Sequence, residues 1–167
     1  NGRRRQRQMC IRDRIISIPF TREDEFFKSF QTTTDDTNML ITGLFSKSDN
    51  KFFNSMIFFS DNINIYNKRK LVPFGEYTPW YNSLLKLAEN LNIPLSNLSS
   101  GPERIEKISF GNINIIPMIC FESTFPNLIE SSSDQEIIVN ISNDAWFGES
   151  LAPHQHLQIT QIRAVSY

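Results

Sequence analysis

The sequence has little net charge, no long apolar run and only two cysteines. The net charge of the 167 residues is −1 at pH 7, whereas nucleic-acid-binding domains normally present a basic face, so nucleic acid is not supported as a partner. The longest apolar clusters, around Phe52–Phe59 and Ile113–Phe121, are broken by Asn and Ser. No stretch therefore reaches the ~18 consecutive apolar residues of a membrane span. The length and composition fit one globular domain with a real core.

The first fourteen residues, NGRRRQRQMCIRDR, differ from the rest and hold six of the 17 basic residues. One interpretation is a basic tail that binds an acidic surface. The other is a segment foreign to the protein, because QMCIRDR resembles translated sequencing-adaptor DNA. We expect residues 1–14 to be non-native and a single domain to occupy residues 15–167. Cys120 is then the only native cysteine, and it is either a small buried hydrophobe or a reactive thiol.

Strand patterns recur along the native part. Two apolar runs flank the predicted turn SKSDN, and a further run alternates apolar and polar residues. A later hairpin is predicted to turn at Gly111–Asn112. The last strand is almost continuously apolar, which predicts a central position in its sheet. The predicted strands cover Asn38–Ser46, Lys51–Ser60, Ile63–Lys68, the hairpin Lys107–Cys120 and Glu136–Ser142.

Helical patterns alternate with these strands. The clearest has Thr78 as a cap, Pro79 in its first turn and Trp80 on its apolar face. The loop NDAWFG precedes the last helix. The predicted helices cover Asp24–Gln31, Thr78–Leu91, Pro126–Ser131 and Pro153–Tyr167. The alternation predicts a mixed α/β domain built of layers.

Cys120 ends the apolar stretch NIIPMIC and is followed by FESTFP. The strand prediction places it at the carboxyl end of a strand, the edge where reactive groups of α/β sheets tend to lie. The thiolate is the nucleophile, and an ordinary cysteine has a pKa of about 8.5, so a base or a cation must activate it. The residue pattern leaves two interpretations open, a nucleophile and a buried structural thiol.

A possible activating group lies in YNKRKLVPFGEYTP, residues 66–79. The three cations Lys68–Lys70 are typical of a solvated face. However, the turn-forming VPFG would draw Glu76 inward and leave Lys68 facing the same region. A lysine ammonium can stabilise a thiolate and an oxyanion, and a carboxylate can orient that lysine or relay protons.

The two histidines, His154 and His156, fall in the last predicted helix. Their spacing of two residues sets their side chains about 200° apart on a helix, so they form a weak metal pair. A Cys–His pair remains possible, although nothing in the sequence marks either histidine for it. We expect Asn143 and Asp144 to fix their loop through bonds from side chain to backbone.

Three separated segments, KRKLVPFGEY, MICFESTFP and ISNDAWFGESLAPHQH, together resemble the nitrilase superfamily of carbon–nitrogen hydrolases. Within it they are similar to the apolipoprotein N-acyltransferase family of bacteria. The resemblance covers roughly residues 16–167 and implies an α-β-β-α sandwich, incomplete at both ends. It matches the catalytic lysine to Lys68, the nucleophile to Cys120, and two further acidic residues to Glu76 and Glu122.

The resemblance also implies an activity. An acyl chain would pass from a phospholipid to Cys120 as a thioester, and then to the α-amino group of a diacylglyceryl-modified apolipoprotein. Lys68, with the backbone N–H of Phe121, would stabilise the oxyanion, Glu76 would hold Lys68 or assist proton transfer, and Glu122 would orient groups near the thiol or support its loop. No cofactor or metal is implied. The implied location is the bacterial inner membrane, with the domain on the periplasmic face and membrane helices outside this chain.

Substrate contacts are implied for Phe121, Trp146 and Phe147, the last two lining an apolar entrance; core packing is the alternative for those two. Phe121 stands where the family commonly has Tyr. The family's general-base glutamate would align near Ile15, where the foreign-looking segment joins, so we expect this fragment to lack the base and to be inactive. The rival functions are an amidase acting on a small amide and a non-catalytic fragment.

Overall fold

The computed structural model describes residues 34, 37–80, 97–103, 108–129 and 136–166. The predicted helix Asp24–Gln31 and most of the predicted helix Thr78–Leu91 lie outside these residues. Among the described residues, no helix is long and apolar enough to cross a membrane.

The first sheet is antiparallel and has the order β1-β2-β3. Its strands are β1 (Leu40–Ser48), β2 (Lys51–Phe59) and β3 (Asn64–Asn67), which confirms the three predicted strands with small shifts at their ends. The turn between β1 and β2 is tighter than the predicted SKSDN. It consists of Asp49 and Asn50, with φ of 47° and 61°. Positive φ at both positions matches the right-handed twist of a two-residue hairpin, and Asp and Asn tolerate that region better than most residues.

The second sheet is mixed and has the order β4-β5-β6. β4 (Ile108–Phe110) and β5 (Ile113–Ile119) form the predicted hairpin, and Gly111 takes φ of 57° at its turn. β6 (Glu136–Ile141) runs parallel to β5. The prediction of a central position for β6 is wrong among the described strands, where β5 is central and β6 lies at the edge. Every residue of β6 keeps part of its surface exposed.

The two sheets pack face to face through alternate residues of their strands. The contact consists of Met56 and Phe58 of β2, Tyr66 of β3, and Ile108, Ile115 and Ile119 from the second sheet. The opposite face of the first sheet carries a second buried cluster of Leu44, Ile57 and Phe59. The first sheet is therefore buried on both faces.

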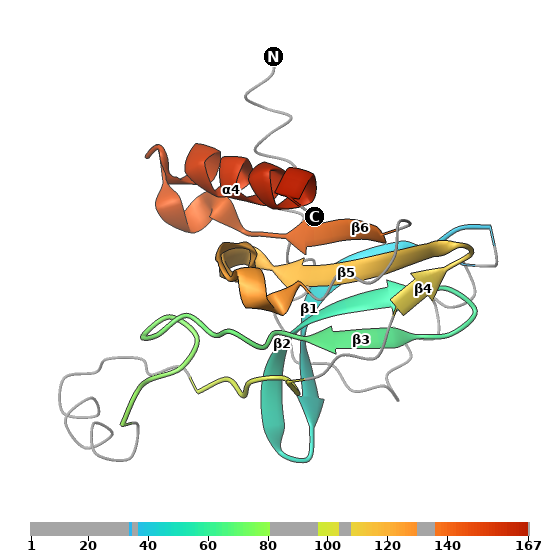
Figure 1. The fold of residues 1–167 in the computed structure, drawn as a ribbon. Coiled ribbons are helices and arrows are strands. Elements are labelled where there is room, and N and C mark those ends of the chain that lie inside the picture. The colour runs from blue at the N-terminus through green and yellow to red at the C-terminus, as the bar shows by residue number, and fades with distance from the viewer. Residues whose placement is uncertain (1–33, 35–36, 81–96, 104–107, 130–135, 167) are drawn as a thin grey trace.

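The last helix, α4 (Ala152–Ser166), is confirmed and lies along the sheet of β4–β6, on the side away from the first sheet (Figure 1). It contacts the 3₁₀ turn η1 (Cys120–Thr124) that directly follows β5. The described residues thus form a sheet–sheet–helix arrangement, which is part of the expected α-β-β-α sandwich.

Three local predictions need correction. Pro79 and Trp80 form a turn in which Trp80 has φ of 54° and is 78% exposed, so neither residue belongs to a helix or to an apolar face. Pro126 opens only a short 3₁₀ turn, η2 (Pro126–Leu128). The NDAWFG stretch contains a further 3₁₀ turn, η3 (Asp144–Phe147), rather than an open loop.

Candidate functional site

A cavity of about 570 Å³ lies where the two sheets meet. The first sheet and the loop after it contribute Lys68 and Glu76, and the end of β5 contributes Cys120. The sequence-predicted lysine, carboxylate and thiol therefore line one cavity. Most of the remaining wall is apolar and consists of Phe45, Phe52, Val72, Leu98, Ile119, Ile141 and Phe147.

Cys120 is the first residue after β5 and has φ of 53°. This left-handed conformation is uncommon for a residue other than glycine, and its cost, about 1–3 kcal/mol, has to be offset by the surrounding contacts. The sharp bend exposes a side chain at the end of a strand, as the nucleophile turns of α/β enzymes do. The thiol is free, half-buried and part of the cavity lining; its role as a nucleophile stays a prediction.

Lys68 follows β3 and is 1% exposed. Its backbone N–H donates to the carbonyl of Asn54 at 2.8 Å, and its Nζ lies 2.6 Å from Oε2 of Glu76. The solvated-face interpretation of the basic run is wrong for Lys68, although it holds for Lys70, which is exposed. The difference arises because side chains alternate between the faces of a strand, and β3 directs Lys68 to the same side as Tyr66.

Glu76 is drawn inward by the VPFG turn, as predicted. Its N–H donates to the carbonyl of Val72 at 2.9 Å, while its Oε2 accepts from the N–H of Val72 at 2.8 Å. Oε1 accepts from Nδ2 of Asn54 at 2.6 Å. The carboxylate thus has three donors, including Lys68, and it fixes the lysine amine at the cavity. Asn54 is a supporting residue that the sequence analysis missed.

Glu122 is fully buried and does not line the cavity. Its Oε1 accepts from the backbone N–H groups of Arg69 and Lys70, at 2.7 and 3.0 Å. Its Oε2 accepts from the N–H of Ile119 at 2.8 Å and from the hydroxyl of Tyr66 at 2.9 Å. Glu122 therefore ties the segment that carries Lys68 to the turn that carries Cys120, the geometry expected of a residue that supports the loop.

Tyr66 is the second supporting residue that the sequence analysis missed. Burial, together with the negative charge of Glu122, raises the pKa of its phenol well above the usual value of 10.0. The hydroxyl is consequently neutral across the physiological range and donates its proton to Glu122. Tyr66 also packs between the sheets, so one residue joins the core to the site.

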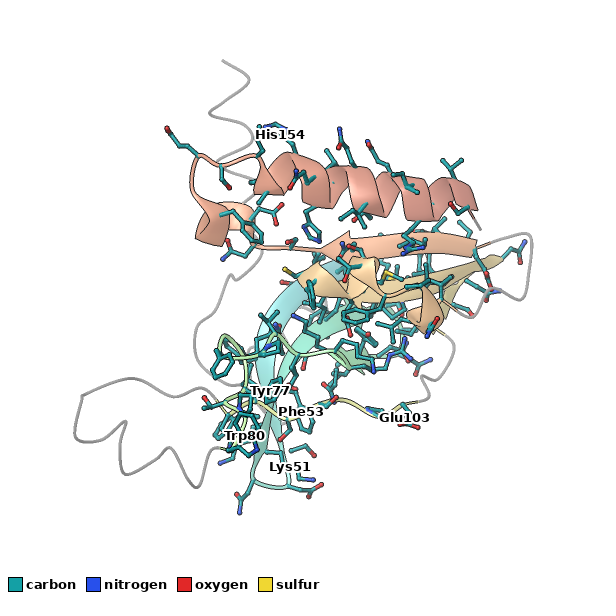
Figure 2. All side chains as sticks on the ribbon, turned by 60° about the vertical axis from the view of Figure 1, so that its left-hand side comes forward. Lys51, Phe53, Tyr77, Trp80, Glu103 and His154 are labelled. Carbon is teal, nitrogen blue, oxygen red and sulfur yellow. The ribbon has the colours of Figure 1, made fainter. Side chains whose placement is uncertain are left out.

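His156 lies beside Cys120, a contact that the sequence analysis missed. Its Nε2 is 2.8 Å from the carbonyl oxygen of Cys120, and its Nδ1 is 3.1 Å from Oδ1 of Asp144. Asp144 also accepts from the hydroxyl of Ser142 at 2.6 Å, so both contacts are to side chains, not to backbone as we expected. His154 is exposed and points away from the sheet (Figure 2), as the predicted 200° separation requires.

The three expected substrate-binding aromatics have different surroundings. Phe147 lines the cavity and is 43% exposed. Phe121 does not line it and instead packs edge-on against Phe125, with ring centres 5.1 Å apart. The side chain of Trp146 lies outside the described part of the chain. Within the described residues, no three His, Cys, Asp or Glu side chains gather as a metal-ligand set.

Known proteins resemble this chain in sequence. The model of the carbon-nitrogen hydrolase family matches residues 12–167. Apolipoprotein N-acyltransferases are similar in sequence. The one from Pseudomonas paraeruginosa is 33% identical over 141 residues, 81% of this chain and 28% of that protein. The one from Nitrosomonas europaea is 39% identical over 122 residues, 72% of this chain and 24% of that protein. The chain therefore spans about a quarter of the length of these relatives.

Solved structures share the fold. A CN-hydrolase superfamily protein from Xanthomonas campestris has a TM-score of 0.61 at 15% identity, over 87% of this chain and 51% of that one. A carbon-nitrogen hydrolase from Helicobacter pylori has a TM-score of 0.55 at 19% identity, over 83% of this chain and 45% of that one. Together with the family match over nearly the whole sequence, this fold identifies the chain as a member of the carbon–nitrogen hydrolase family.

Proposed function

We propose that the full-length protein is an apolipoprotein N-acyltransferase. In this proposal, an acyl chain moves from a phospholipid to Cys120 and from there to the α-amino group of a diacylglyceryl-modified lipoprotein. The observation that carries the proposal is the shared cavity, in which the thiol of Cys120 and the buried Lys68–Glu76 pair face an apolar wall. The sequence similarity to apolipoprotein N-acyltransferases supports the choice of substrates.

In the first half-reaction, the thiolate of Cys120 attacks the ester carbonyl of the phospholipid. The negative charge that develops on the carbonyl oxygen is stabilised by the ammonium of Lys68, which Glu76 holds in place from a distance of 2.6 Å. The tetrahedral intermediate then collapses, the C–O bond breaks, and the leaving lysophospholipid oxygen receives the proton that was earlier removed from the thiol. The proton acceptor would be the general base that the family resemblance aligns near Ile15, outside the described residues.

In the second half-reaction, the α-amino group of the lipoprotein attacks the thioester. The same ammonium stabilises the second oxyanion, the C–S bond breaks, and Cys120 returns to the thiolate form. The amine loses one proton to the base as the amide forms. Water is the competing nucleophile, so an enclosed and largely apolar site favours transfer over hydrolysis.

The apolar wall gives the cavity its preference for a hydrocarbon chain. Each buried CH₂ group contributes roughly 0.8 kcal/mol, so a long acyl chain gains far more than a short amide substrate could. The apolar wall near Cys120 includes Phe45 and Phe52 of the first sheet, Ile141 of β6 and Phe147 of η3. Because both substrates are lipids held in a membrane, we place the enzyme at the bacterial inner membrane with this domain on the periplasmic face.

The test is direct detection of the acyl-enzyme. The full-length protein is incubated with a phospholipid that carries an isotopically labelled acyl chain, quenched in acid and digested. We expect mass spectrometry to find a thioester on the Cys120 peptide that hydroxylamine removes. Cys120→Ser should give no thioester and no transfer. Lys68→Met should slow acylation at least about 100-fold, the usual effect of removing one oxyanion donor.

Two results would contradict the proposal. Full transferase activity in Cys120→Ser would exclude Cys120 as the acyl carrier. Rapid turnover of short aliphatic amides, with no acylation by phospholipid, would identify the protein as a small-amide hydrolase of the same family.

A further inference from the structure

The backbone of Cys120 has a strained conformation, and α4 is the element that holds it. Cys120 has φ of 53°, and its carbonyl oxygen accepts three hydrogen bonds. The donors are Nε2 of His156 at 2.8 Å, the hydroxyl of Ser123 at 3.3 Å and Nδ2 of Asn140 at 3.4 Å. The bond from His156 is the shortest of the three, and it is the one that α4 provides.

The surroundings of His156 specify its proton positions. A carbonyl oxygen only accepts hydrogen bonds, so Nε2 must carry a proton. Nδ1 faces the carboxylate of Asp144 at 3.1 Å and the hydroxyl of Ser142 at 3.4 Å. The hydroxyl of Ser142 donates to Asp144 at 2.6 Å, so its own proton is already used. Both ring nitrogens therefore face acceptors, which is the arrangement of an imidazolium paired with a carboxylate.

His156 belongs to a polar stripe on the inward side of α4. Thr160, four residues later, accepts from Nδ2 of Asn140 at 3.2 Å. Arg163, seven residues later, donates to the carbonyls of Ser123 at 3.2 Å and Thr124 at 3.4 Å. Residues spaced by four and seven lie on one side of a helix. Through these polar contacts the stripe binds Asn140 of β6 and the backbone carbonyls of Cys120, Ser123 and Thr124 in η1. No residue of α4 is fully buried.

We propose that His156, charged and anchored by Asp144, is a positioning residue that holds the peptide of Cys120 in its left-handed conformation and so aims the thiol at the cavity. The inference rests on the proposed role of Cys120 as acyl carrier. His156 acts through the backbone of Cys120 and does not itself take up the proton of the thiol, because Nε2 is already bonded to the carbonyl.

The experiment compares two substitutions of His156 in the full-length protein. His156→Leu removes both bonds, whereas His156→Gln keeps a neutral N–H donor at about the position of Nε2. We expect His156→Leu to lower the first-order rate of Cys120 acylation about 100-fold, the usual cost of a misplaced reacting group, with the KM for the phospholipid unchanged. His156→Gln should lose only about tenfold, because a neutral donor makes a weaker bond than an imidazolium.

His154→Leu is the matched control, since His154 is exposed on the other side of the same helix; it should acylate at the wild-type rate. Asp144→Asn should match His156→Gln, and it gives a second measurement if His156→Leu does not fold. Wild-type acylation of Cys120 tests the proposed function separately; its absence would overturn that proposal and, with it, the positioning role that rests on it. With wild-type acylation present, an unchanged rate in His156→Leu, or equal losses in the Leu and Gln variants of matched thermal stability, would overturn the positioning role.

Discussion

Two buried carboxylates, Glu76 and Glu122, belong to the region around Cys120 and differ in their partners. Glu76 pairs with the ammonium of Lys68 and lines the cavity. Glu122 accepts from three backbone N–H groups and one phenol, with no cation among these donors. A buried anion with neutral donors depends on each of them, because every lost donor leaves part of its charge unsatisfied.

Tyr66→Phe tests this dependence. The substitution removes the phenol donor to Glu122 and keeps the ring in the core. We expect the free energy of unfolding at pH 7 to fall by about 1.5–3 kcal/mol, the value typical of a hydrogen bond to a charged group. Urea denaturation of the full-length protein, followed by tryptophan fluorescence, measures the change.

The same variant has a predictable pH dependence. The pKa of Tyr66 is raised in the folded state above the usual 10.0, so folding favours the neutral phenol. Its contribution is fully present below pH 10 and is lost progressively as the pH rises above 10, where the unfolded chain ionises first. The stability difference between wild type and Tyr66→Phe should therefore be constant from pH 7 to 9 and narrow above pH 10. A difference that stays constant to pH 11 would contradict the assignment.

At the scale of elements, the end of β3 is fixed by a close approach of Gly101. The N–H of Gly101 donates to the carbonyl of Lys68 at 2.8 Å. A Cβ added to Gly101 would lie only 2.2 Å from the carbonyl oxygen of Asn67, which belongs to the strand backbone. Backbone cannot move aside as a flexible side chain can, so a larger residue must displace the end of β3 and, with it, Lys68.

Gly101→Ala is expected to lower the free energy of unfolding by about 1–3 kcal/mol, as overpacking usually does. It should also reduce Cys120 acylation, because the amine of Lys68 moves with the strand. Gly111→Ala is the control. Gly111 has φ of 57° with nothing within 4 Å of an added Cβ, so that variant should lose stability through backbone strain alone and keep its acylation rate. Equal acylation in the two variants would show that β3 tolerates the displacement.

At the scale of the whole molecule, the site depends on the contact between the two sheets. Lys68 comes from the end of one sheet and Cys120 from the end of the other. The side chains of Met56, Tyr66 and Ile119 belong to the buried cluster between these sheets, and Ile119 also lines the cavity. Ile57 is equally buried but lies on the opposite face of the first sheet.

Met56→Ala and Ile57→Ala form a matched pair at this scale. Each should lower the free energy of unfolding by about 2–5 kcal/mol, the usual cost of a large-to-small change in a core. Only Met56→Ala should also slow Cys120 acylation, because its cavity opens between the elements that hold the lysine and the thiol. Acylation is measured at a temperature where both variants remain folded. Comparable slowing in Ile57→Ala would indicate a general loss of rigidity instead.

Most of the fold could be predicted from the sequence. Two apolar runs and one alternating run predicted the strands of the first sheet, and Gly111–Asn112 marked the hairpin of the second. The turn-forming VPFG stretch predicted that Glu76 would meet Lys68, which the 2.6 Å contact confirms. These features depend on residues that are close along the chain, where spacing and turn chemistry act directly.

Contacts between distant segments could not be predicted in this way. The edge position of β6 and the turn at Trp80 were missed because apolar content predicts burial but not the neighbours that provide it. Tyr66, 56 residues before Glu122, and Asp144, 12 residues before His156, were missed as partners for the same reason.

The sequence by itself thus determined the strands, the position of Cys120 at a strand end and the pairing of Lys68 with Glu76. Only the tertiary structure decided that Glu122 joins the two loops and that His156, not His154, faces Cys120. The physical reason is that helical spacing separates two side chains by an angle but does not say which of them is turned toward the sheet. That choice is made by the contacts of α4 with η1 and β6, which form only when the chain has folded.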